Sequence, residues 1–191
     1  DASFSKLDEI VGNAVWSGVK LVVAPETAVG NIKELKDGVD HLPRLAEIAE
    51  KQKVYLATSY LRSEKGNVYN QGVILSPDGK LILSHKKIYL AKPEVEEDGI
   101  KSGDKLEVVK TEIGKLGMLI CKDGFNKYSH FLSEKFNELG SEIICIPTWS
   151  LTWPDMNTQE YIKALYIYGA FASRSFILVS GNLNKSTGSF G

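Results

Sequence analysis

Apolar residues recur along this chain at helical and strand-like spacings in turn. Over 4–15 they fall three or four positions apart, which predicts a helix that ends at Gly18. A continuous apolar run at 21–24 follows and predicts a short buried strand. The same order repeats with a helix over 40–52 and a strand over 54–60. This alternation predicts a layered α/β fold.

The middle of the chain departs from this order with a hairpin and a long loop. A strand over 68–76 leads into the turn Ser76-Pro77-Asp78-Gly79, and a return strand begins at 81. Residues 91–104 are polar and acidic, and loops of this length without regular structure are usually functional or disordered. The remaining predicted elements are strands at 106–109, 116–120, 142–146 and 176–180 and helices at 128–139 and 156–173.

Composition fits a single α/β domain over residues 1–191. The chain is 43% hydrophobic and 25% charged, and its 23 basic and 24 acidic residues leave a net charge of -1. A near-neutral, mixed-sign surface argues against nucleic acid or a membrane surface as a partner. No apolar run approaches the roughly 20 residues that span a bilayer, and the first residues lack a signal-peptide pattern. We therefore expect a cytoplasmic protein.

The two cysteines differ in their sequence context. Both Cys121 and Cys145 lie at or near the end of an apolar run, which favours reduced thiols over a disulfide. Cys145 is expected in the core, because free cysteine is among the most buried residue types. Cys121 is followed at once by two charged residues and a glycine, a sharp turn at a strand end of the kind that presents a nucleophile.

A carboxylate and an ammonium stand at comparable places, since Glu26 and Lys87 also lie at or near strand ends. A glutamate can take the proton of the Cys121 thiol, and a lysine can stabilise both a thiolate and a tetrahedral intermediate. Taken singly, each residue has a plainer interpretation: Cys121 as a small buried hydrophobic residue, Glu26 as a solvated loop acid or a helix cap, and Lys87 as a solvated strand end. Periodicity alone does not select these three.

Four local motifs do select them. The segments 21–28, 69–80, 85–90 and 117–123 resemble, in that order, the glutamate motif, the hairpin, the lysine motif and the cysteine motif of the nitrilase, or carbon–nitrogen hydrolase, superfamily. Each motif alone is weak, but the four in order cover most of the chain. The resemblance implies a four-layer α-β-β-α sandwich, two subunits paired through helices, and no metal or organic cofactor.

The resemblance also implies roles for named residues. Cys121 is the expected nucleophile, Glu26 the general base and Lys87 the electrostatic stabiliser, and the backbone N–H of Lys122 completes the oxyanion hole. The expected reaction is hydrolysis of a non-peptide C–N bond in a small amide or carbamoyl compound, through a cysteine thioester that releases ammonia. Acyl or amide transfer, nitrile hydrolysis and a non-catalytic binding or assembly role are the alternatives.

Many members of the superfamily carry a second catalytic glutamate in the loop after the lysine. The spacing from Glu96 through Ile100 to Gly103 matches their pattern, so Glu96 is the expected residue. Glu94 and Glu97 are near enough to be alternatives.

Departures from the pattern bear on the branch and the substrate. Nitrilases proper usually show Cys-Trp-Glu, whereas this chain has Cys121-Lys122-Asp123, nearer to amidase-type members. Asp123 is expected to cap or orient the turn, because aspartate accepts backbone N–H bonds well there. Phe125 and Trp149 are expected to line the substrate pocket, although a core position for Trp149 is equally open.

Other features complete the expectation. The family's first strand and its C-terminal part have no counterpart, so the chain resembles a partial carbon–nitrogen hydrolase domain. The three histidines, His41, His85 and His130, are too scattered to indicate a metal site. We expect a homodimer or a higher homo-oligomer that acts on a small-molecule amide.

Overall fold

Two four-stranded sheets face each other in the computed structural model, which describes residues 2–29, 39–149 and 156–181. The first sheet has the order β1-β2-β3-β4, with β1 parallel to β2 and the other pairs antiparallel. Its strands are Leu21–Val23 (β1), Tyr55–Glu64 (β2), Asn67–Leu75 (β3) and Leu81–Lys86 (β4).

The second sheet mixes strand directions. Its order is β5-β6-β7-β8, where β5 and β6 are antiparallel and β6, β7 and β8 run parallel. Its strands are Val108–Thr111 (β5), Gly114–Met118 (β6), Ile143–Pro147 (β7) and Phe176–Ser180 (β8).

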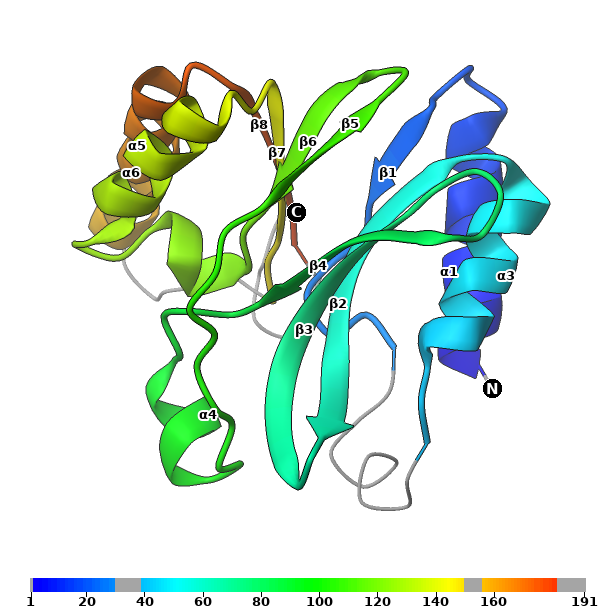
Figure 1. Cartoon of the computed structure of the whole chain (residues 1–191), viewed down its shortest axis with the longest axis horizontal. Helices are drawn as coiled ribbons and strands as arrows, with labels where there is room; N and C mark the ends of the chain where they lie inside the picture. The colour runs from blue at the N-terminus through cyan, green and yellow to red at the C-terminus, as the bar shows by residue number, and fades with distance from the viewer. Residues whose placement is uncertain (1, 30–38, 150–155, 182–191) are drawn as a thin grey trace.

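Helices cover the outer face of each sheet, so the layers run helix, sheet, sheet, helix (Figure 1). Helices α1 (Ala2–Val15) and α3 (Leu42–Gln52) lie on the first sheet, and α5 (Ser129–Leu139) and α6 (Met156–Ser173) on the second. The short helix α4 (Lys92–Glu96) stands apart from these layers. The predicted α-β-β-α sandwich is confirmed. Among the described residues, no helix has the length and apolar character needed to cross a bilayer.

Three apolar clusters fill the spaces between the layers. Leu45 and Leu56 belong to the cluster under α1 and α3, Ile74 and Met118 to the one between the sheets, and Phe136 to the one under α5 and α6. Strand β2 is buried on both faces over 55–60, which explains why it is a nearly continuous apolar run in the sequence.

Several elements differ from the sequence-based prediction. Strand β5 lies at Val108–Thr111 instead of 106–109, and β6 at Gly114–Met118 instead of 116–120. Strand β2 continues to Glu64, beyond the predicted end at 60, because Lys65 and Gly66 both have positive φ and form a two-residue turn into β3. The predicted loop 91–104 contains helix α4, which Pro93 helps to start because its fixed φ suits a first helical turn.

Candidate active site

Glu26 lies just after β1 and is buried, with 4% of its surface exposed. Its Oε1 accepts hydrogen bonds from Lys87 Nζ at 2.7 Å and from Asn70 Nδ2 at 2.8 Å. Its Oε2 accepts one from the backbone N–H of Trp149 at 2.8 Å. The buried Glu26 carboxylate thus accepts hydrogen bonds from three protein donors and does not depend on water. Glu26 is therefore not the water-exposed loop acid of the plainer interpretation.

Lys87 follows β4 and is 2% exposed, with its Nζ between two carboxylates. Besides Glu26, the Nζ contacts Glu94 Oε2 at 2.8 Å. The Lys87 main chain is held on both sides: its N–H donates to Asn70 O at 3.0 Å, and its carbonyl accepts from Gly103 N–H at 2.8 Å. Burial lowers the pKa of Lys87, but the nearby Glu26, Cys121 and Glu94 raise it more, so the net pKa is above its ordinary value. Lys87 is therefore an ammonium across the physiological range.

Glu94, not Glu96, supplies the second carboxylate of this cluster. Glu94 Oε1 accepts from Asn70 Nδ2 at 3.0 Å, and Oε2 also accepts from the backbone N–H of Ala91 at 2.6 Å. The Glu96 side chain is 60% exposed and lies 3.7 Å from Lys92 Nζ on the surface of α4. The expected position of Glu96 is thus corrected: residues two apart on a helix point to different sides, and only Glu94 points inward. The alternative Glu97 is also exposed.

Cys121 opens a short 3₁₀ helix, Cys121–Gly124 (η1), three residues after the end of β6. Its φ of 47° lies in the left-handed region, which is uncommon for a residue with a side chain and is frequent at functional turns. Burial and the carboxylate of Glu26 raise the pKa of the thiol, while Lys87 and the backbone N–H of Trp149 act in the opposite direction. The net pKa is raised, so the resting group is a neutral thiol near the Glu26 carboxylate.

Asp123 is fully buried behind the cysteine turn and accepts four hydrogen bonds. Its Oδ2 accepts from Ile120 N–H at 3.1 Å and from His85 Nε2 at 3.0 Å. Its Oδ1 accepts from the N–H groups of Ile88 at 3.0 Å and Tyr89 at 2.7 Å. The expectation that Asp123 orients the turn is confirmed, and the same carboxylate also binds the segment after the lysine.

The other predicted site residues lie around this cluster. The Lys122 side chain turns away from a ligand role, because its Nζ donates to Leu90 O at 2.7 Å. Phe125 packs edge-on against Tyr166, with ring centroids 6.1 Å apart. Trp149 is 57% exposed, so a core position is excluded. Its backbone N–H donates a hydrogen bond to Glu26 Oε2.

Asn70 is a site residue that sequence reasoning did not single out. It is 2% exposed on β3 and its amide bridges Glu26 and Glu94. The sequence signal was a polar side chain in an otherwise buried strand. The prediction for Cys145 is confirmed, since it is fully buried in the core, and burial alone raises its pKa to about 12.

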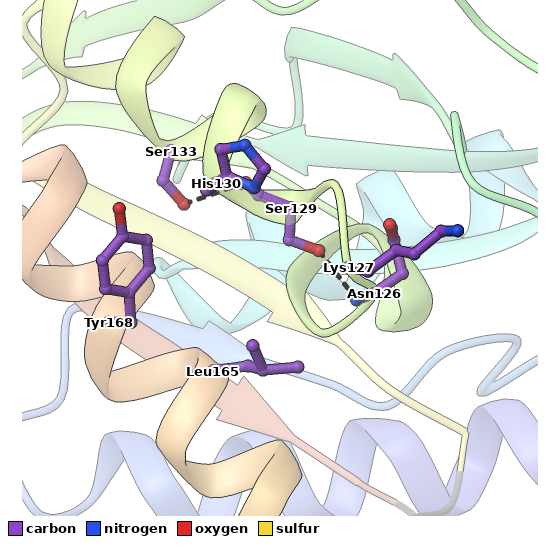
Figure 2. A pocket seen from close by; sticks show the side chains of 7 residues that line it. All are labelled: Asn126, Lys127, Ser129, His130, Ser133, Leu165 and Tyr168. Atoms are coloured by element: carbon purple, nitrogen blue, oxygen red, sulfur yellow. Dashed lines mark hydrogen bonds between the residues drawn. The ribbon is translucent and has the colours of Figure 1, made fainter.

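A separate hollow lies between the start of α5 and helix α6 (Figure 2). The two serine side chains of this hollow form hydrogen bonds with nearby backbone groups. Ser129 Oγ accepts from Asn126 N–H at 2.8 Å, and Ser133 Oγ donates to the Ser129 carbonyl at 3.2 Å. Within residues 2–29, 39–149 and 156–181, no group of three His, Cys, Asp or Glu residues is arranged to hold a metal ion.

The carbon–nitrogen hydrolase family model matches residues 1–188. Nitrilase 3 of Arabidopsis thaliana is 27% identical over 180 residues, which cover 80% of this chain and 51% of that protein. An omega-amidase of Xenopus tropicalis is 25% identical over 154 residues, or 73% of this chain and 55% of that protein. The chain thus spans about half the length of these relatives.

Solved structures share the fold. A carbon–nitrogen hydrolase from Helicobacter pylori G27 superposes with a TM-score of 0.81 at 20% identity, over 98% of this chain and 73% of that one. An amidase from Nesterenkonia sp. superposes with a TM-score of 0.80 at 16% identity, over 98% of this chain and 72% of that one. A Glu-to-Gln mutant of the amidase from Nesterenkonia sp. AN1, with a TM-score of 0.76 at 16% identity over 92% of this chain and 70% of that one, shows acrylamide joined to its active-site cysteine by Michael addition.

Proposed function

Since the chain belongs to the carbon–nitrogen hydrolase family, we propose that it hydrolyses the C–N bond of a small amide or carbamoyl compound through a Cys121 thioester. The observation that carries this proposal is the buried cluster in which the Glu26 carboxylate contacts the Lys87 ammonium at 2.7 Å, with the Cys121 thiol close enough for both charges to act on its pKa. A base, a nucleophile and a fixed positive charge are the parts that acyl transfer requires.

The reaction follows from the protonation states at rest. Glu26 takes the thiol proton as the sulfur of Cys121 attacks the carbonyl carbon, and the resulting oxyanion is stabilised by the Lys87 ammonium and the backbone N–H of Lys122. The C–N bond then breaks, and Glu26 returns the proton to the departing nitrogen, which leaves as ammonia. Water next attacks the thioester carbonyl carbon and passes a proton to Glu26. The C–S bond then breaks, Glu26 returns that proton to the Cys121 sulfur, and the carboxylic acid leaves.

Glu94 has a supporting role in this scheme. It contacts Lys87 Nζ at 2.8 Å and shares Asn70 with Glu26, so it holds the lysine and the amide in place while the proton moves. Phe125 and Trp149, at the ends of η1 and β7, are proposed to contact the substrate beside Cys121. The exposed ring of Trp149 supports this assignment.

An amide is favoured over a nitrile by the residues after the nucleophile. Cys121 is followed by Lys122 and Asp123, as in amidase-type members, and the structural relatives named above include an amidase. Two curated relatives are named nitrilase and omega-amidase, so nitriles belong in the substrate panel. Adding an amine acceptor distinguishes transfer from hydrolysis by its product.

The test is ammonia release by the purified protein over a panel of small amides, carbamoyl compounds and nitriles. We expect activity on at least one amide, lost by more than about 10³-fold in Cys121→Ala. Cys145→Ala is the matched control, because it removes the other cysteine from the core and leaves the site intact. Retention of activity in Cys121→Ala would refute the mechanism, and an inert Cys121 that does not react with a mild electrophile would favour a binding or assembly role.

We extend the proposal to assembly and location. Apolar side chains on α6 stand in solvent, with Ile167 64% and Phe171 81% exposed, which supports packing of a second copy against the outer helices. The molar mass measured by light scattering tests this, and a monomer at micromolar concentration would contradict it. Two free thiols, Cys121 and Cys145, support a reducing compartment such as the cytoplasm.

A further inference from the structure

The charged and nucleophilic groups of the site come from two different sheets. Lys87 follows β4 of the first sheet, whereas Cys121 follows β6 of the second. The distance between ammonium and sulfur therefore depends on how the two sheets are held against each other at this edge. Apolar packing between sheets tolerates small shifts, but acyl transfer does not, since a displacement of 1 Å can cost about 100-fold in rate.

One buried pair joins the two sheets at this point. His85 stands two residues before Lys87, and Asp123 stands two residues after Cys121. Their side chains meet at 3.0 Å, with His85 3% exposed and Asp123 fully buried. A hydrogen bond to a carboxylate in a site shielded from water is strong and directional. Each partner is thus two residues along the chain from a proposed catalytic group.

We propose that the His85–Asp123 pair is a positioning element that fixes Lys87 relative to Cys121. The proposal rests on the function proposed above, because it assigns the pair to that same site. Neither residue contacts the reacting atoms. The pair acts through the backbone: Asp123 also accepts from the N–H groups of Ile88 and Tyr89, which directly follow Lys87.

The bonding of His85 defines its part in the pair. A carboxylate only accepts, so Nε2 of His85 carries the hydrogen that it donates to Asp123. In the described part of the chain, Nδ1 of His85 has no hydrogen-bond partner. Among the described residues, Asp123 is therefore the one hydrogen-bond partner of the imidazole. Removing it deletes one bond between the sheets and leaves the three backbone bonds to Asp123 in place.

This asymmetry makes His85 the better residue to change. Asp123→Asn would set an amide N–H against donors that now point at a carboxylate, and the lost buried hydrogen bonds would destabilise the fold. His85→Leu removes the donor at similar volume. His85→Gln restores an N–H near the position of Nε2 and is the conservative rescue.

Ser175→Ala is the matched control. Ser175 forms a buried hydrogen bond with Ser141 at 2.6 Å, where β7 and β8 begin, at the other end of the second sheet. The Ser175→Ala substitution removes a buried hydrogen bond from the second sheet and leaves the cluster of Glu26, Lys87 and Glu94 unchanged.

Two measurements are made on each folded variant: the rate at which iodoacetamide alkylates Cys121, followed by mass spectrometry, and kcat and KM for the best amide of the panel. For His85→Leu we expect kcat to fall by roughly 10- to 100-fold with KM within about threefold, and alkylation to change by at least about threefold. His85→Gln is expected to recover both to within about threefold of the unchanged protein, and Ser175→Ala to alter neither.

Unchanged kcat and alkylation in His85→Leu would overturn the proposal. So would equal impairment of His85→Gln and His85→Leu, because the hydrogen bond would then be irrelevant. The alkylation measurement needs no turnover. If no amide is hydrolysed but His85→Leu alters alkylation and His85→Gln restores it, the proposed reaction fails while the positioning role stands.

Discussion

Replacing Glu26 with glutamine separates two properties of Cys121 that usually change together. In the resting site the Glu26 carboxylate raises the pKa of the thiol, and in the reaction it accepts the thiol proton. Glu26→Gln removes the negative charge and the base at once. We therefore expect amide hydrolysis to fall while simple alkylation of the thiol becomes faster.

The structure sets how the glutamine sits. Its oxygen has to face Lys87 and Asn70, which both donate to Oε1, so its NH₂ group faces the backbone N–H of Trp149. That donor–donor contact replaces a 2.8 Å hydrogen bond and costs about 1–3 kcal/mol of folding free energy. The ammonium of Lys87 keeps two acceptors, the side-chain oxygen of the new glutamine and the carboxylate of Glu94, so the hydrogen-bonded cluster remains.

The two rates then move in opposite directions. Loss of a general base lowers kcat by about 10²- to 10⁴-fold, or about 3–5.5 kcal/mol in activation free energy. For alkylation, each unit by which the thiol pKa falls gives about tenfold more thiolate. The lower basicity reduces its nucleophilicity by about threefold, so the net gain is about threefold per unit.

The assay pairs ammonia release with iodoacetamide alkylation at pH 7, with Glu96→Gln as the control because that carboxylate is exposed on α4. Slower alkylation in Glu26→Gln would refute the electrostatic reasoning. Hydrolysis above about a tenth of the starting rate would refute the assignment of Glu26 as the base.

Three further predictions follow, two from the same cluster and one from the core. Glu94→Gln is expected to lower kcat by roughly 10- to 100-fold, because Lys87 loses a carboxylate at 2.8 Å, whereas Glu96→Gln stays within about twofold; equal kcat values for the two variants would contradict the placement of Glu94. Lys87→Met is expected to lower the free energy of unfolding by about 3–5 kcal/mol, since it leaves two buried carboxylates without their cation; urea denaturation measures this, and a loss below about 1 kcal/mol would contradict it. Burial raises the pKa of Cys145 to about 12, while an unfolded cysteine ionises near 8.5, so its contribution to stability is complete below about pH 8.5 and is lost as pH rises toward 12. Between about pH 9 and 10.5, Cys145→Ala should therefore lose stability more slowly, by about 1.4 kcal/mol per pH unit, and an unchanged slope would refute this.

Local motifs were sufficient to predict the sandwich. They also selected Glu26, Lys87 and Cys121 as candidates among many similar residues, and the structure brings Glu26 and Lys87 into contact. Spacing was not sufficient for the second carboxylate. A pattern counted along the chain selected Glu96, but α4 turns that side chain to solvent and carries Glu94 inward to Lys87. Which side of a five-residue helix faces the site depends on how the helix docks, and the local sequence does not encode this.

Bonds between distant segments were also beyond sequence reasoning. Asn70 is one polar residue of a strand, and its importance comes from two carboxylates 44 and 24 positions away. Asp123 was expected to orient its own turn, which it does. Its bonds to the segment after Lys87 exist only because β4 and β6 belong to sheets that face each other.

The pairing of two carboxylates with one ammonium has a consequence for the energetics of the whole cycle. With a neutral thiol at rest, Glu26, Glu94 and Lys87 sum to one negative charge. When the oxyanion forms, Glu26 has become neutral and the new negative charge lies on the substrate, so the total is unchanged. The same holds once the thioester has formed and Glu26 has given up its proton. Because charge moves over a few ångströms without any net gain in the buried site, no step has to bring a new ion out of water, and the protein dipoles around Glu26 need little reorientation between states.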